Sequence, residues 1–114
     1  MLTIEALNTY GANTAEGLNR CMNNESFYFR LIKMSLQDSS FDKLRTALEA
    51  GDLSAAFEAA HALKGVMGNL ALTPIYKPVA EATELLRRGT QMDYAPYVEE
   101  ILHQKELLSQ LCAD

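Results

Sequence analysis

The chain has 114 residues, of which 48% are hydrophobic and 22% charged, which favours one folded domain over residues 1–114 rather than a disordered chain. Its formal net charge of −5 and its lack of a basic stretch argue against nucleic-acid binding, because phosphate contacts need clustered cations. Cys21 and Cys112 lie far apart without CxxC spacing, which favours reduced thiols over a zinc site or a disulfide framework.

The N-terminus, MLTIEALNTYG, lacks the basic and long apolar segments of a signal peptide. No stretch of the chain approaches the roughly 20 apolar residues that span a bilayer. We therefore expect a cytoplasmic protein with no membrane partner. The start at Met1 favours a free-standing protein over a piece of a larger one, and we expect it to be a monomer.

Apolar residues at helical spacing begin with three segments near the N-terminus, over residues 3–10, 14–22 and 24–36. Gly11 is placed to end the first of these helices, since glycine adopts the left-handed conformation at low cost. Asn24 is a natural N-cap for the third, because its side chain can accept from the backbone of the first turn.

A further helix is predicted from Phe41 to the Gly-Asp pair at 51–52, and Asp52 then caps a long helix that stops near Leu72. The long helix has a continuous apolar stripe at steps of three and four residues. Its members are Leu53, Ala56, Phe57, Ala60, Leu63, Met67 and Leu70. This stripe predicts the face that packs into the core.

The next helix is predicted over residues 73–88, with Thr73 as N-cap and Pro74 in the first helical position. Gly89 follows as its C′ residue. Pro78 lies inside this helix and removes a backbone donor, so we expect its first turn to be loose or kinked.

Asp93 is predicted to cap a last helix that extends toward the C-terminus. No segment shows the alternating pattern of a strand. The expected fold is therefore all-α, an up-and-down four-helix bundle with short additional N-terminal helices.

The segment HALKGVMG at 61–68 stands out, because each of its two glycines costs roughly 1 kcal/mol relative to alanine inside a helix. On a helical projection His61 lies about a quarter turn from the centre of the apolar stripe. Gly65 and Gly68 fall along the same ridge, and Lys64 is three residues away. The imidazole therefore has no large side chain beside it on its own ridge.

This arrangement suits a phosphoryl acceptor. An imidazole is largely unprotonated at neutral pH and is then a competent nucleophile. A phosphoryl group on His61 would carry about two negative charges, which Lys64 would partly neutralise. A protein donor needs close access to the backbone, which Gly65 and Gly68 would give.

The segment HALKGVMGNLAL resembles the signature of histidine-containing phosphotransfer (HPt) domains, the phosphoryl carriers of two-component phosphorelays. The Gly-Asp pair before the long helix, the Thr-Pro pair before the next and the LLRRG ending fit the same family. The resemblance implies a bundle that takes a phosphoryl group from the aspartate of one receiver domain and passes it to another. It implies no ATP site and no cofactor, with magnesium on the receiver, and receiver domains of response regulators or hybrid histidine kinases as partners.

Carried over by position, the resemblance implies that His61 is phosphorylated and that Lys64 stabilises the phosphoryl group. Arg87 and Thr83 are expected near that group. The expected docking residues are Ala62, Gly65, Gly68 and Asn69.

The chain departs from the family pattern at three positions. Met67 replaces a small residue and would crowd the site, and Ala71 stands where glycine is common. Thr83 replaces a longer polar residue that often supports the histidine ring, so the ring would be less firmly oriented.

Two other functions stay open at this point. The chain could be a helical docking module that binds a signalling partner through the Gly65 and Gly68 face and never carries phosphate. It could also be an enzyme with His61 as general base, but no second catalytic group accompanies it. The remaining candidate groups fit a rim histidine and helix-surface charges better than a catalytic or metal site: His103, Glu81, Glu84, Glu99 and Glu100.

Overall fold

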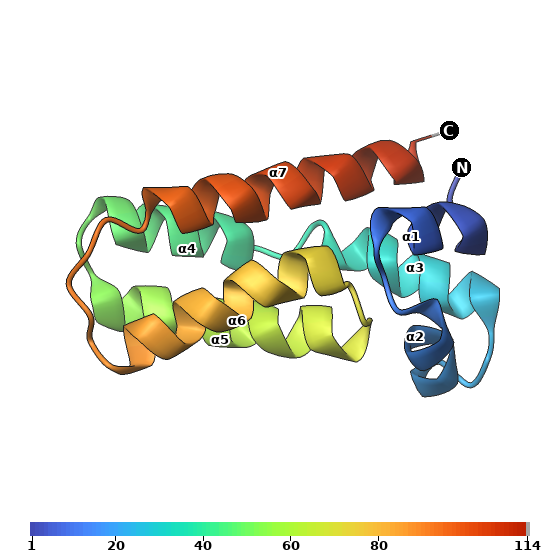
Figure 1. Ribbon diagram of the computed structural model, residues 1–114, viewed down its shortest axis with the longest axis horizontal. Coiled ribbons are helices and arrows are strands. Elements are labelled where there is room, and N and C mark those ends of the chain that lie inside the picture. Colours follow the sequence, from blue (N-terminus) through green and yellow to red (C-terminus); the bar gives the residue numbers. More distant parts are fainter. Residues whose placement is uncertain (114) are drawn as a thin grey trace.

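The computed structural model describes residues 1–113, and every regular element within them is a helix (Figure 1). Four helices form the bundle: α4 (Ser40–Glu49), α5 (Leu53–Asn69), α6 (Thr73–Arg87) and α7 (Ala95–Cys112). Helix α5 packs against α6 on one side and α4 on the other, while α7 packs against α6. The predicted all-α bundle is confirmed.

Three short helices cover one end of this bundle, as predicted: α1 (Ile4–Tyr10), α2 (Thr14–Arg20) and α3 (Glu25–Ser35) (Figure 1). Helix α1 ends because Gly11 adopts a φ of 113°. The Asn24 side chain accepts a 3.0 Å hydrogen bond from the Phe27 amide and so caps α3. The two termini lie close together, since the Met1 amino group donates to the Ala113 carbonyl.

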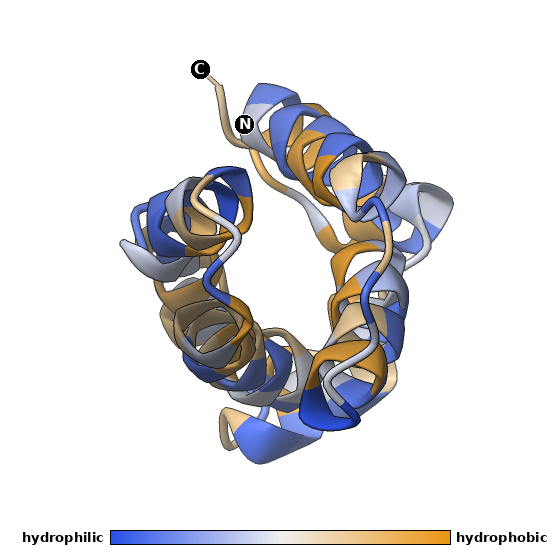
Figure 2. Cartoon of the chain, turned by 90° about the vertical axis from the view of Figure 1, so that its left-hand side faces the viewer, coloured by the Kyte–Doolittle hydropathy of each residue, from blue (hydrophilic) through white to orange (hydrophobic). Residues whose placement is uncertain are grey.

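The core lies between the inner sides of the helices, where hydrophobic segments gather in the view along the bundle (Figure 2). Within the predicted stripe of α5, Leu63 and Met67 are fully buried, whereas Leu53 and Phe57 are only half-buried. Helix α5 is therefore turned so that the edge of its stripe reaches the surface, which matters for the site. Among the helices within residues 1–113, none has the length and apolarity that crossing a bilayer requires.

The junction between α5 and α6 differs from the prediction. Helix α5 ends at Asn69 rather than near residue 72, and Ala71 takes a left-handed φ of 55° that reverses the chain. Leu72, not Thr73, is the N-cap of α6, and it forms no side-chain cap hydrogen bond. The tight reversal uses residues that helix propensity alone would have left in the helix, because tertiary packing overrides that propensity.

The other helix ends agree more closely with the sequence. Gly89 adopts a φ of 69° and its amide donates to the Leu86 carbonyl, which ends α6 as predicted. The helix continues through Pro78, so this proline does not interrupt it. The N-cap residue of α7 is Tyr94 rather than Asp93, although the Asp93 carboxylate accepts a 2.9 Å hydrogen bond from the Ala95 amide and still orders the first turn.

Candidate functional site

His61 lies in the middle of α5 with its side chain exposed. Its ring stacks on Phe57, one turn earlier, with centroids 5.6 Å apart and an interplanar angle of 19°. Within residues 1–113, no hydrogen bond or ion pair engages the imidazole nitrogens of His61. Stacking therefore orients the ring while leaving its nitrogens open to a reactant.

The stack continues to the neighbouring helix. The guanidinium carbon of Arg87, from α6, lies 5.1 Å from the centroid of the Phe57 ring on which His61 stacks. Phe57 was predicted to be a core residue, but it is a half-buried platform that joins His61 to Arg87. Arg87 and His61 thus both contact the Phe57 ring, and a place for Arg87 near a phosphoryl group stays a prediction.

Lys64 is held by a residue that the sequence interpretation set aside. Its Nζ lies 3.9 Å from Oε1 of Glu84, and Oε2 of the same carboxylate lies 3.5 Å from Nε of Arg87. The three side chains are 31%, 47% and 50% exposed, in the order Lys64, Glu84, Arg87. The three-residue spacing of Glu84 and Arg87 could have predicted their ion pair, because such residues are neighbours on a helix. The contact between Glu84 and Lys64 joins two helices and could not be predicted from spacing.

Two predicted neighbours of the histidine have buried side chains. Thr83 is fully buried, and its hydroxyl donates a 2.7 Å hydrogen bond to the Val79 carbonyl of its own helix. Met67 is also fully buried and belongs to the core. The Thr83 hydroxyl is thus engaged by its own helix, whereas Met67, although buried, is among the residues that line the groove at His61.

The two glycines of the histidine helix have different surroundings. Gly65 is exposed, and a Cβ built there would have no heavy atom within 4 Å. A Cβ at Gly68 would lie 3.1 Å from Cε1 of Tyr76, so this glycine makes room for the tyrosine ring. The expectation of open access therefore holds for Gly65, whereas at Gly68 the space is used by packing within the molecule.

A groove of about 620 Å³ runs from His61 toward the C-terminal end of α5. Lys64, Gly65 and Gly68 of α5 line this groove, together with Asn69 at the end of the same helix. The cations along it are Arg20, Lys64 and Lys77, and the one carboxylate among its lining residues is that of Glu16. The fourth predicted docking residue, Ala62, is exposed but lines a separate groove between α4 and α5.

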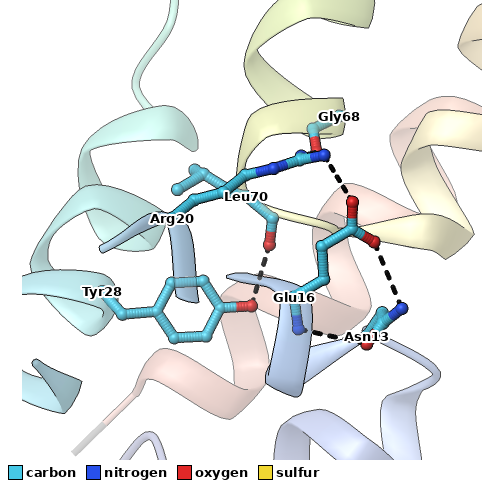
Figure 3. A network of polar contacts seen from close by, with 6 residues as sticks. All are labelled: Asn13, Glu16, Arg20, Tyr28, Gly68 and Leu70. Atoms are coloured by element: carbon cyan, nitrogen blue, oxygen red, sulfur yellow. Dashed lines mark hydrogen bonds and ion pairs between the residues drawn. The ribbon is translucent and has the colours of Figure 1, made fainter. Parts of the chain in front are cut away.

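Glu16 and Arg20 of α2 line the far end of this groove, and Figure 3 shows their polar contacts. Arg20 donates to the Gly68 carbonyl and pairs with Glu16. The Tyr28 hydroxyl donates a 2.8 Å hydrogen bond to the Leu70 carbonyl. The contacts to Gly68 and Leu70 fasten the N-terminal helices to the end of the histidine helix, and no local sequence pattern predicts these two, because they join residues far apart in the chain.

The other titratable groups within the described part of the chain form no comparable site. His103 is exposed on α7 and is not among the residues that line the groove at His61. Within residues 1–113, no cluster of three or more histidine, cysteine or acidic side chains could hold a metal ion.

The structure thus places an exposed histidine on α5 of a four-helix bundle, with a lysine and an open glycine on the next turn. The comparison with protein families agrees: the Hpt domain model matches residues 33–114, and the chain belongs to this family. Hpt domains are phosphocarrier modules of two-component signalling that interact with receiver domains, and they are not themselves enzymes. Comparisons with curated proteins and with solved structures gave no match. The family match begins within α3, so α1 and α2 lie outside it.

Proposed function

We propose that the protein is a phosphorelay intermediate in which His61 accepts a phosphoryl group from a receiver aspartate and passes it to another receiver. The observation that carries this proposal is the exposed His61 ring, oriented by Phe57 with both nitrogens unengaged by other residues of the described chain. An unprotonated imidazole nitrogen held in a fixed orientation is suited to attack on phosphorus.

In the acceptance step, the unprotonated nitrogen of His61 attacks the phosphorus of the receiver's aspartyl phosphate. A P–N bond forms, the P–O bond to the aspartate breaks, and the carboxylate leaves with the electron pair. Donation to a second receiver is the reverse, so no proton needs to be supplied to the leaving carboxylate. Lys64 neutralises charge on the transferred group, Arg87 assists from α6, and magnesium belongs to the receiver.

The receiver approaches over Gly65. The absence of any heavy atom within 4 Å of a Cβ at this position supports a close approach of a partner backbone beside His61. Exposed Asn69 and Ala62 flank Gly65 on the same side of α5 and extend the docking surface.

The test is transfer from receivers to this chain. A panel of purified receiver domains is loaded with acetyl phosphate, desalted and mixed with the wild type, His61→Gln and His103→Gln. We expect an acid-labile label on the wild type and on His103→Gln, localised to the peptide containing His61, and none on His61→Gln. Folding of each variant is checked by circular dichroism.

Equal labelling of His61→Gln would overturn the assignment of His61. Receiver binding by the wild type without any labelling would instead support the alternative, a docking module that binds a signalling partner through the Gly65 face and carries no phosphate.

A further inference from the structure

We infer that Glu84 is an intramolecular substitute for the phosphoryl group: it holds the cations of the site before phosphorylation and competes for them afterwards. The inference rests on the proposed function of His61. It assigns a role in tuning phosphohistidine stability to a side chain that does not itself react.

The first observation is that both oxygens of Glu84 are used, each by a different cation. Oε1 faces Lys64 of α5 at 3.9 Å and Oε2 faces Arg87 of α6 at 3.5 Å. A carboxylate and a phosphoryl group present similar anionic oxygens to ammonium and guanidinium donors. Glu84 therefore occupies the partners that a phosphoryl group on the neighbouring histidine would attract.

The second observation is the place of these cations relative to His61. Lys64 is one turn further along the same helix, and Arg87 lies against Phe57, on which the His61 ring stacks. Before any phosphate arrives, Lys64 is thus held on the turn next to His61, and Arg87 is linked to the ring through Phe57. Preorganised donors of this kind stabilise charge in the product without a rearrangement of the site.

The third observation is that the contacts are weak enough to exchange. The Lys64, Glu84 and Arg87 side chains are between 31% and 50% exposed, and ion pairs at such positions contribute little. A phosphoryl group with about two negative charges attracts the same cations more strongly than one carboxylate. Glu84 should then lose its partners while its own charge remains nearby and repels the phosphoryl group.

This competition has a predictable sign. Removing the charge of Glu84 should make phosphohistidine longer-lived for two reasons. Lys64 and Arg87 are then free to neutralise the phosphoryl group, and the carboxylate that repels this group is gone. In hydrolysis, water attacks phosphorus, the P–N bond breaks, and inorganic phosphate leaves while the imidazole nitrogen takes up a proton. The half-life of that reaction reports on the charges around the ring without any receiver present.

The experiment uses the full chain loaded with potassium phosphoramidate, in which the P–N bond to ammonia is exchanged for a P–N bond to His61; a phosphorylated receiver serves as the second donor. After desalting, loss of the phosphoryl group is followed by intact mass in Glu84→Gln and in Glu99→Gln. Glu99 is an exposed control on α7 that lines a groove containing none of the His61-site residues. We expect Glu84→Gln to lengthen the half-life about two- to fivefold, the range that exposed charge pairs produce, and Glu99→Gln to leave it unchanged.

A second arm tests the route of the effect. In a Lys64→Ala background the gain from Glu84→Gln should shrink, and it should also shrink at high salt, which a purely structural role would not cause. An unchanged or shorter half-life in Glu84→Gln would overturn the inference, since Glu84 would then be inert or would support the cations instead of competing for them. If neither donor labels His61, the proposed function itself fails, which is a different outcome.

Discussion

Around His61, an aromatic stack and an ion-pair network meet on one surface formed by α5 and α6. Phe57 orients the imidazole, and Arg87 lies over the same phenyl ring. Glu84 then joins Arg87 to Lys64. Orientation of the nucleophile and neutralisation of the transferred charge are thus provided by neighbouring parts of one small surface, with no enclosed pocket.

The first prediction concerns Gly65. Gly65→Ala should stabilise the fold by up to about 1 kcal/mol, because alanine restores helix propensity at a position where its Cβ meets no atom within 4 Å. Gly65→Gln should also keep the fold, yet its side chain would obstruct a receiver beside His61. Thermal unfolding and receiver affinity are measured on the same two variants. Normal receiver binding by Gly65→Gln would show that this is not the docking face.

The part of the site on α5 could be predicted because it depends on helical periodicity alone. His61, Lys64 and Gly65 are neighbours on any α-helix, whatever surrounds it. The contribution of α6 depended on the rotation of that helix, and one residue changes the direction of a side chain by about 100°. The resemblance implied Thr83 near the phosphoryl group; the structure buries its side chain and pairs the next residue, Glu84, with Lys64.

At the scale of elements, α2 and α3 pack against the end of the histidine helix through close contacts. Gly17 of α2 lies against the fully buried Tyr28 ring, and a Cβ at this glycine would be 2.4 Å from the tyrosine hydroxyl oxygen. That hydroxyl is in turn hydrogen-bonded to the Leu70 carbonyl just beyond α5. The position of α2 along the groove therefore depends on a glycine and a tyrosine together.

Gly17→Ala tests this packing and is matched to Gly65→Ala, the same change in an open place. We expect Gly17→Ala to destabilise the protein by about 1–3 kcal/mol, because the buried tyrosine cannot move aside without losing its hydrogen bond. Chemical denaturation of the two variants against the wild type gives both values. A stabilising Gly17→Ala would mean that α2 is not held against α3 in this way.

The pH dependence of stability tests the same contact. Burial raises the pKa of Tyr28 to about 12, from an ordinary value of 10.0. The stability that the protonated hydroxyl contributes is fully present below pH 10 and is lost as the pH rises toward 12, because the unfolded chain ionises first. The expected slope for this one group is roughly 1.4 kcal/mol per pH unit.

Denaturation between pH 9 and pH 11.5 measures that slope in the wild type and in Tyr28→Phe. The variant should be less stable at pH 9, by about 1–2 kcal/mol for the lost hydrogen bond, and should lose stability less steeply above pH 10. Parallel curves for the two proteins would show that Tyr28 titrates normally and is not held as the structure has it.

None of these contacts among α2, α3 and α5 was accessible from the sequence, although their helices were. Asn24 and Gly11 mark helix ends through local backbone chemistry, which a single sequence records. The hydrogen bond from Tyr28 to Leu70 spans 42 residues and depends on how whole helices dock. The prediction of Thr73 as the N-cap of α6 was wrong for the same reason. The N-cap is Leu72, because the packing of α5 on α6 fixes the turn at Ala71.

On the scale of the whole molecule, an acidic chain presents a locally cationic groove. The formal net charge is −5, yet Arg20, Lys64 and Lys77 outnumber the one carboxylate among the residues that line the groove. Such an arrangement favours a partner that brings negative charge to this surface while the rest of the molecule repels other anions. The bundle itself was predictable from apolar periodicity, whereas this concentration of charge required the helices to be placed.

The central claim is that phosphate is carried, that is, both received and given away at His61. The direct measurement is a chase: the labelled protein is separated from its donor, mixed with a second unphosphorylated receiver and magnesium, and both proteins are followed by intact mass and peptide mapping. We predict that the label leaves His61 and appears on the receiver aspartate faster than it is lost as inorganic phosphate in a control without receiver. Label that stays on His61 with every receiver that binds, or that never resides on His61, would contradict the account.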